Sequence, residues 1–239
     1  MDPAGDRLGY LQSDRFGKGW LEARTVGDPL VEHLVHPWML KKLGEVIVIG
    51  NERVLDAGCG DGPRTQLMLQ NFPGLRITAG DFNPEIVAAA RKALPETVDV
   101  GQLNAGGKYP YPDNEFTAAV CINVFMHLSA RQMARCAREM RRVIKPDGVG
   151  LITTTNDRFA QRMYDANGDA RKYWYARPSI DPNHRTHIPP AAFLEKIFSR
   201  AGFKVAVSEP VIPAPDELSL PERYKEIVGL PIFINLELR

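Results

Sequence analysis

Three glycines at alternate positions, Gly58, Gly60 and Gly62, are the clearest chemical signal in this sequence. They follow an apolar run that ends at Leu55, and Pro63 begins a stretch with helical character. Glycine permits positive φ and has no Cβ, so backbone at these positions can lie directly against a ligand. Proline suits the first position of a helix, where its missing N–H costs nothing. The stretch therefore predicts a strand, a ligand-binding turn and a helix start.

The spacing of this turn indicates what it binds. Dinucleotide-binding loops read G-x-G-x-x-G, whereas here Asp56 precedes the first glycine and Pro63 stands where the last glycine or alanine should be. A carboxylate would repel a pyrophosphate but suits a ligand with an ammonium and a sulfonium, which disfavours an NAD-dependent oxidoreductase. The stretch resembles motif I of the class I S-adenosylmethionine-dependent methyltransferases. That resemblance implies cofactor contacts by Asp56, Gly58, Cys59 and Gly60.

A second acid, Asp81, follows the predicted strand 76–80. Ligands of open parallel sheets lie over the carboxyl ends of the strands. A carboxylate there can accept from both hydroxyls of a ribose, and in the resembling family an acid at this position does so. Phe82 would then flank the adenine. The alternative for Asp81 is an acid that merely interacts with the dipole of the next helix.

Residues 109–116 resemble the family's turn before the fourth strand, and residues 142–148 resemble its turn before the fifth, so the resemblance runs in register from about residue 50 to 155. Asn104 and Ala105 stand where the family has an acid and a small residue beside the adenine amino group. Asn104 departs from that acid, but its side-chain oxygen can still accept a hydrogen bond. Asn123 follows the fourth predicted strand, 118–122, and the resemblance places it beside the methionine part of the cofactor.

Three histidines, His127, His184 and His187, are candidate general bases because histidine titrates near neutrality. His127 lies in the segment after the fourth strand, and His187 precedes a predicted helix that begins at 189–190. Each could instead have a purely structural role. No histidine or cysteine spacing suggests a metal site, so we predict none.

Aromatic residues gather in two regions outside the predicted cofactor-binding core. Residues 1–50 read as an N-terminal helical cap or lid, although the apolar residues at helical spacing from Asp28 onward favour a helix that packs its apolar face on the sheet. Residues 51–239 form the cofactor-binding domain, with a substrate-facing insertion at 156–189. The predicted substrate-binding residues are Tyr10, Phe16, Trp20, Tyr164, Tyr173, Trp174 and Tyr175.

The alternation of apolar runs, turns and helical stretches predicts an α/β, Rossmann-like fold. The resemblance implies a seven-stranded, mostly parallel sheet of order 3-2-1-4-5-7-6. Its last strand would be antiparallel, and helices would cover both faces. Lys145–Gly148 reads as a turn before the fifth strand.

Composition limits the cellular context and the partners. The chain has 239 residues and a formal net charge of +1, so nothing attracts a polyanion broadly and we predict no nucleic-acid partner. Its three cysteines, Cys59, Cys121 and Cys136, read as reduced thiols of a cytoplasmic protein. The acidic start, residues 1–6, is unlike a secretory signal, and no apolar run is long enough for a membrane helix. A homodimer is left open.

Together these features predict an enzyme that transfers a methyl group from S-adenosylmethionine, leaving S-adenosylhomocysteine. We expect the acceptor to be a small cyclic or aromatic metabolite of the secondary-metabolite kind, methylated on a heteroatom, with oxygen favoured. The alternatives are an N-methyltransferase of a small amine or sugar and a non-catalytic S-adenosylmethionine-binding protein. An RNA or protein methyltransferase is disfavoured, because the chain lacks a basic patch and an N-P-P-[YF]-type motif after the fourth strand.

Overall fold

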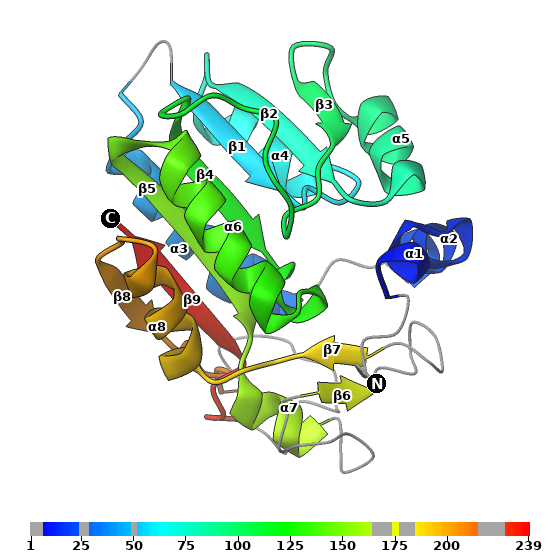
Figure 1. Ribbon diagram of the computed structural model, residues 1–239, viewed down its shortest axis with the longest axis vertical. Coiled ribbons are helices and arrows are strands. Elements are labelled where there is room, and N and C mark those ends of the chain that lie inside the picture. Colours follow the sequence, from blue (N-terminus) through cyan, green and yellow to red (C-terminus); the bar gives the residue numbers. More distant parts are fainter. Residues whose placement is uncertain (1–6, 24–28, 49–51, 164–173, 177–184, 215–227) are drawn as a thin grey trace.

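A computed structural model of the chain describes residues 7–23, 29–48, 52–163, 174–176, 185–214 and 228–239. Seven strands form one sheet in the order β3-β2-β1-β4-β5-β9-β8 (Figure 1). Counted along this sheet, the order is 3-2-1-4-5-7-6, as predicted. Strands β1 to β5 are parallel, and β9 runs antiparallel to both β5 and β8. The strands are β1 (Arg53–Ala57), β2 (Arg76–Asp81), β3 (Asp99–Gln102), β4 (Phe116–Ile122), β5 (Ile144–Thr155), β8 (Val205–Ser208) and β9 (Phe233–Leu238).

Helices cover both faces of the sheet, as predicted. Because neighbouring strand residues point to opposite faces, Val54 packs in one core cluster and Leu55 in the other. The first face carries α3 (His36–Gly44), α4 (Pro63–Asn71) and α5 (Pro84–Ala93), and the second carries α6 (Ala130–Val143) and α8 (Ala191–Arg200). A π-helical turn, η1 (Val31–Val35), leads into α3. Of the described helices, none combines the length and apolarity needed to cross a membrane.

Local sequence signals mark the starts of two of these helices. Ser129 and Gln132 form a reciprocal capping box at the start of α6. At the start of α5, the Asn83 side chain accepts hydrogen bonds from the backbone N–H groups of Glu85 and Ile86. The prediction of a turn before the fifth strand at residues 145–148 is wrong, because β5 already begins at Ile144 and includes these residues. Ile144 pairs with Phe116 and Val149 with Ala118, so residues 145–148 bulge out of the strand against Thr117.

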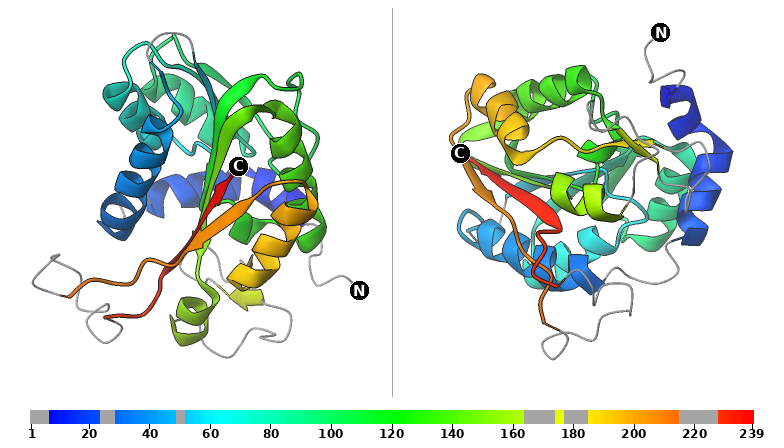
Figure 2. Two further views of the ribbon diagram at one scale, coloured as in Figure 1. Left: turned by 90° about the vertical axis from the view of Figure 1, so that its left-hand side faces the viewer. Right: turned by 90° about the horizontal axis from the view of Figure 1, so that it is seen from below.

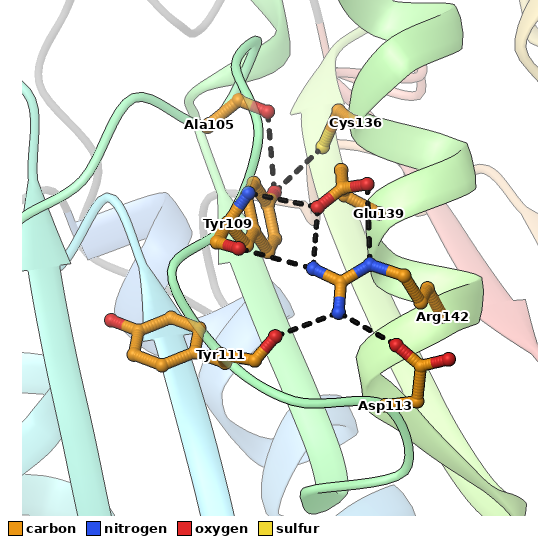
Figure 3. A network of polar contacts seen from close by, with 7 residues as sticks. All are labelled: Ala105, Tyr109, Tyr111, Asp113, Cys136, Glu139 and Arg142. Carbon is orange, nitrogen blue, oxygen red and sulfur yellow. Dashed lines mark hydrogen bonds and ion pairs between the residues drawn. The ribbon is translucent and has the colours of Figure 1, made fainter.

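A polar network fastens the loop before β4 to α6 (Figure 3). The Arg142 guanidinium donates to the Tyr111 carbonyl at 2.7 Å, the Asp113 carboxylate at 2.9 Å and the Glu139 carboxylate at 2.6 Å. Glu139 also accepts from the Tyr109 backbone N–H at 2.8 Å, and Arg142 donates to the Tyr109 carbonyl at 3.1 Å. Each charge therefore has a partner of opposite sign within the chain.

The N-terminal region divides into two parts. The helix α3 packs into the main core through Met39 and Leu43, which confirms the prediction that these apolar residues can face the sheet. In contrast, α1 (Arg7–Gln12) and α2 (Asp14–Ala23) lie beyond the sheet next to α5 (Figures 1 and 2). The insertion at 156–189 includes α7 (Asp157–Met163) and a two-stranded antiparallel sheet of β6 (Trp174–Ala176) and β7 (Arg185–His187), which the sequence did not predict.

Candidate functional site

The glycine turn is held tightly at the carboxyl end of β1. The backbone N–H groups of Gly58 and Cys59 both donate to the Gly80 carbonyl, at 2.6 and 3.0 Å. Gly58 and Gly60 have φ of 85° and 61°, a region of backbone conformation in which residues with a side chain are strained. A Cβ at Gly58 would also stand 2.1 Å from a Val124 methyl carbon. The turn therefore requires glycine at Gly58 and presents bare backbone at this end of the sheet.

The Asp56 carboxylate supports this turn from inside the core. It is fully buried, and it accepts from Arg64 Nε at 3.1 Å and from Thr65 Oγ1 at 2.7 Å. Arg64 in turn donates to the Gly58 carbonyl at 2.8 Å. The direct contact with the cofactor that we predicted for Asp56 stays a prediction. Within the chain, its oxygens accept from Arg64 and Thr65, so the carboxylate also helps to fix the position of the turn.

Asp81 lies opposite the turn, at the end of β2. Its Oδ2 accepts from the Gly60 backbone N–H at 3.2 Å, and its Oδ1 accepts from the Asn83 backbone N–H at 3.1 Å. Burial raises the pKa of the Asp81 carboxyl, against the lowering effect of these backbone hydrogen bonds. Two acceptor oxygens thus lie at the strand end with unused lone pairs. Phe82, next in the chain, packs among apolar residues of α1, α2 and α5.

The other predicted cofactor residues on the first strands differ in what they offer. Cys59 buries its thiol, burial raises the thiol pKa, and Sγ donates to the Gly60 carbonyl of the turn at 3.3 Å. Asn104 Oδ1 already accepts from the Gly106 N–H at 3.0 Å, leaving one lone pair. Ala105 is buried, and its carbonyl accepts from the Tyr109 hydroxyl at 3.2 Å. Their contacts with a cofactor stay predictions.

Asn123 follows β4 with an unusual backbone and an unpaired side chain. Its φ is 59°, and its N–H donates to the Thr153 carbonyl at 2.8 Å. Among the described residues its buried Oδ1 has no hydrogen-bond partner. A buried acceptor without a partner costs free energy, so this oxygen suits a ligand that brings an N–H donor.

Two of the predicted bases lie close together on the same side of the site. His127 ends the short 3₁₀ helix η2 (Phe125–His127), and its ring meets Phe16 edge to face with centroids 6.2 Å apart. His187 is buried on β7, and its Nδ1 lies 3.1 Å from the Leu128 carbonyl. Because a carbonyl only accepts, this hydrogen bond puts the proton of a neutral ring on Nδ1 and makes Nε2 the basic nitrogen. His184 lies outside the described residues.

The predicted substrate residues of the N-terminal region form one cluster. Tyr10 and Phe16 meet edge to face at 5.5 Å, and Trp20 packs beside them against Ile86. The predicted substrate residues of the insertion are described only in part. Tyr164 and Tyr173 lie outside the described residues, while Trp174 and Tyr175 have a described backbone on β6. There Trp174 stands opposite His187 in the β6–β7 register.

Three structural contributions were not anticipated from the sequence. Arg64 was not singled out, although a cation in the first turn of the helix that follows Asp56 is a readable signal for an ion pair. Asn83 has the residue type of a helix cap and caps α5, but its side chain also donates to the carbonyls of Leu11 and Ser13. The Leu128 carbonyl that orients His187 carries no sequence signal, because any residue has one.

Comparison with known proteins agrees with this geometry. Residues 54–148, from β1 to the bulge of β5, match the family described as a methyltransferase domain. A ubiquinone biosynthesis O-methyltransferase of Dechloromonas aromatica is 26% identical over 151 residues, covering 60% of this chain and 62% of that protein. The chain thus spans somewhat less than two thirds of the length of this relative.

Solved structures share the fold at low sequence identity. A methyltransferase from Mesorhizobium loti described as S-adenosylmethionine dependent superposes with a TM-score of 0.69 at 17% identity, covering 87% of this chain and 99% of that chain. The cyclase SpnF superposes with a TM-score of 0.59 at 22% identity, covering 84% and 79%. These likenesses concern the fold alone.

Proposed function

Because the chain belongs to the class I S-adenosylmethionine-dependent methyltransferase superfamily, we propose that it transfers a methyl group to a heteroatom of a small metabolite. One observation carries this proposal. The glycine turn and Asp81 meet at the carboxyl ends of β1 and β2, and Phe16, His127 and His187 lie around the neighbouring η2 segment. A cofactor site and a wall with candidate bases are thus adjacent.

The residues at this site fit S-adenosylmethionine, the cofactor of the superfamily. Asp81 would hold the ribose hydroxyls with the spare lone pairs of its two oxygens. The buried Asn123 Oδ1 would accept from the ammonium group. The backbone of Gly58 and Gly60, which carries no side chain, would border the rest of the ligand. Phe82, Asn104 and Ala105 would lie around the adenine.

When bound, S-adenosylmethionine supplies a methyl group on a sulfonium, which is already an excellent leaving group. The chain has to hold the acceptor in line, exclude water and take up a proton if the nucleophile carries one. We assign the proton to Nε2 of His187, because the Leu128 carbonyl fixes the proton of the neutral ring on Nδ1. His127 is the second candidate base, and Phe16 beside it shields this side from water.

Several features favour a cyclic or aromatic acceptor of the secondary-metabolite kind. Tyr10, Phe16 and Trp20 form an aromatic cluster on α1 and α2, and Phe16 touches His127. The net charge of +1 offers no attraction for a polyanion. The likeness to a ubiquinone biosynthesis O-methyltransferase supports oxygen over nitrogen. We accordingly propose α1 and α2 as a cap, residues 51–239 as the catalytic domain in the cytoplasm, and the insertion at 156–189 as substrate-facing.

One observation supports a second function, binding of the cofactor without methyl transfer. A cyclase shares the fold, so the fold alone does not require methyl transfer. A protein that binds the cofactor without turnover would still need Asp81 and the glycine turn. Turnover therefore has to be measured separately from binding.

The test incubates the protein with methyl-labelled S-adenosylmethionine and a panel of small phenols, catechols, amines and sugars. Calorimetry with S-adenosylhomocysteine gives binding independently. We expect label on a phenolic oxygen and binding in the micromolar range typical of enzyme ligands. Binding without labelled product on any acceptor, including metabolite extracts, would favour the non-catalytic function. Transfer only to RNA or a folded protein would contradict the small-molecule acceptor.

A further inference from the structure

Asn83 stands between the cofactor site and the N-terminal helices. Its backbone N–H donates to Asp81 Oδ1 at 3.1 Å. Its side-chain Nδ2 donates to the Leu11 carbonyl at 2.9 Å and to the Ser13 carbonyl at 3.0 Å. The residue is 1% exposed. Because an amide nitrogen has two protons, both donors of this side chain are used, one on the last turn of α1 and one on the connection between α1 and α2.

The oxygen of the Asn83 amide packs closely against the starts of both α5 and α2. Asn83 Oδ1 accepts from the N–H groups of Glu85 and Ile86, which begins α5. A Cβ on Gly17 would stand 2.5 Å from this oxygen and 2.8 Å from Glu85 Cβ. Glycine at position 17 therefore lets α2 approach the start of α5 closely. Asn83 therefore positions α2 in two ways, by its hydrogen bond to the Ser13 carbonyl and by its close packing against Gly17.

The connection that Asn83 holds also determines where Phe16 lies. Ser13 Oγ donates to the Tyr10 carbonyl at 2.7 Å and accepts from the Phe16 N–H at 3.2 Å. These hydrogen bonds fix the conformation of the connection. Phe16 follows it in the first turn of α2, and its ring packs edge to face against His127. A continuous chain of contacts thus runs from Asp81 through Asn83 and Ser13 to the acceptor side of the site.

We propose that Asn83 is a positioning residue that couples ligand binding at Asp81 to the docking of α1 and α2 over the acceptor side. The inference rests on the proposed cofactor role of Asp81. A ligand that hydrogen-bonds to Asp81 orders residues 81–83, and the ordered Asn83 amide holds the cap in place. By linkage, a docked cap strengthens cofactor binding by the same factor. The acceptor wall is then assembled when the cofactor is present.

Hydrogen exchange tests this coupling without any turnover. Backbone exchange of residues 7–23 is followed by mass spectrometry in the wild type, with and without saturating S-adenosylhomocysteine. We expect the ligand to slow exchange there by about tenfold, within the usual range of coupling between sites. Residues 144–155 of β5 serve as an internal reference, since the core strand should exchange slowly in both states.

Two variants separate positioning from folding. Asn83→Asp keeps an acceptor for the Glu85 and Ile86 N–H groups, so α5 retains its cap, but it removes both donors to Leu11 and Ser13. Gly17→Ala leaves Asn83 intact and pushes α2 away. In both, we expect the ligand-induced slowing to fall below about twofold, with S-adenosylhomocysteine affinity reduced by about the same tenfold coupling factor. Lys18→Ala, at an exposed position beside Gly17, is the matched control and should behave as the wild type.

The outcomes distinguish this inference from the proposed function. If calorimetry shows that the wild type does not bind S-adenosylhomocysteine, the cofactor assignment fails and the coupling fails with it. If the ligand binds but leaves exchange of residues 7–23 unchanged, the coupling alone is wrong. Slowing that persists undiminished in both Asn83→Asp and Gly17→Ala would also overturn it. Slowing in the wild type that both variants lose would support the coupling.

Discussion

Two polar regions of this molecule differ in how their hydrogen-bonding groups are satisfied. In the Arg142 network, the guanidinium donates to the Glu139 carboxylate and to the carbonyls of Tyr109 and Tyr111 (Figure 3). At the carboxyl ends of the strands, Asn123 keeps a buried oxygen with no partner among the described residues. Each region holds one non-glycine residue with positive φ, Asn114 beside Arg142 and Asn123 at the strand ends, so backbone conformation does not separate them. The unmet acceptor at Asn123 does.

The difference teaches where to look for function in this fold. A network that satisfies itself stabilises the loop it holds and has nothing left to offer a ligand. A region that keeps a buried acceptor unsatisfied is retained only if something else compensates for it, which a ligand does when it binds. We therefore expect changes at the strand ends to alter binding and turnover, and changes at Arg142 to alter stability alone.

The largest expected effect is at His187. If Nε2 takes the acceptor proton, His187→Ala should lower turnover by about 10²–10⁴-fold with little change in cofactor affinity. His187→Gln is the matched variant, because its amide can still donate to the Leu128 carbonyl but cannot act as a base. Initial rates of both variants with the best acceptor distinguish a general base from a positioning residue. Turnover restored by Gln would make His187 a positioning residue, and normal turnover of His187→Ala would point to proximity alone.

At Asp81 the expected effect is on binding. Asp81→Ala would lose the proposed charge-assisted bonds to the ribose, each worth about 1.5–3 kcal/mol, so cofactor affinity should fall at least about tenfold. The fold should survive, because the residue lies at the end of β2. Calorimetry and circular dichroism measure the two quantities separately. Unchanged affinity would rule out the ribose role and remove the contrast with the Arg142 network.

What the sequence could predict follows from the range of each signal. Pro63, Asn83 and the Ser129–Gln132 pair act on neighbouring backbone, so their helix starts were predictable. The strand order came from the family resemblance and is confirmed. Contacts made across long sequence separations were missed, because spacing carries no information about them. Asn83 reaches Leu11 across 72 positions, and Phe16 meets His127 through the docking of α2.

The pH dependence of cofactor binding sharpens the contrast further. Because burial raises the Asp81 pKa, the carboxylate is lost at a higher pH than an ordinary aspartate, whose pKa is about 3.9. Cofactor affinity should therefore fall as the pH drops through this raised pKa. Asp81→Asn should bind weakly with no such titration, and an equal pH dependence in that variant would assign it to another group. In the unliganded protein the sign is opposite, because a raised carboxyl pKa adds stability as the pH falls.

The smallest effect on binding is expected at Arg142. Arg142→Met keeps much of the aliphatic volume but leaves the Glu139 carboxylate and the carbonyls of Tyr109 and Tyr111 without this donor. The Arg142 side chain is 25% exposed, so water can replace part of what is lost, and the free energy of unfolding should fall by only about 1–2 kcal/mol. Cofactor affinity should stay within about twofold, because the network satisfies itself and lies on α6. Denaturant unfolding and calorimetry on one preparation measure both quantities. A tenfold loss of affinity here would mean that the loop before β4 transmits to the cofactor site, and the two regions would no longer be separable.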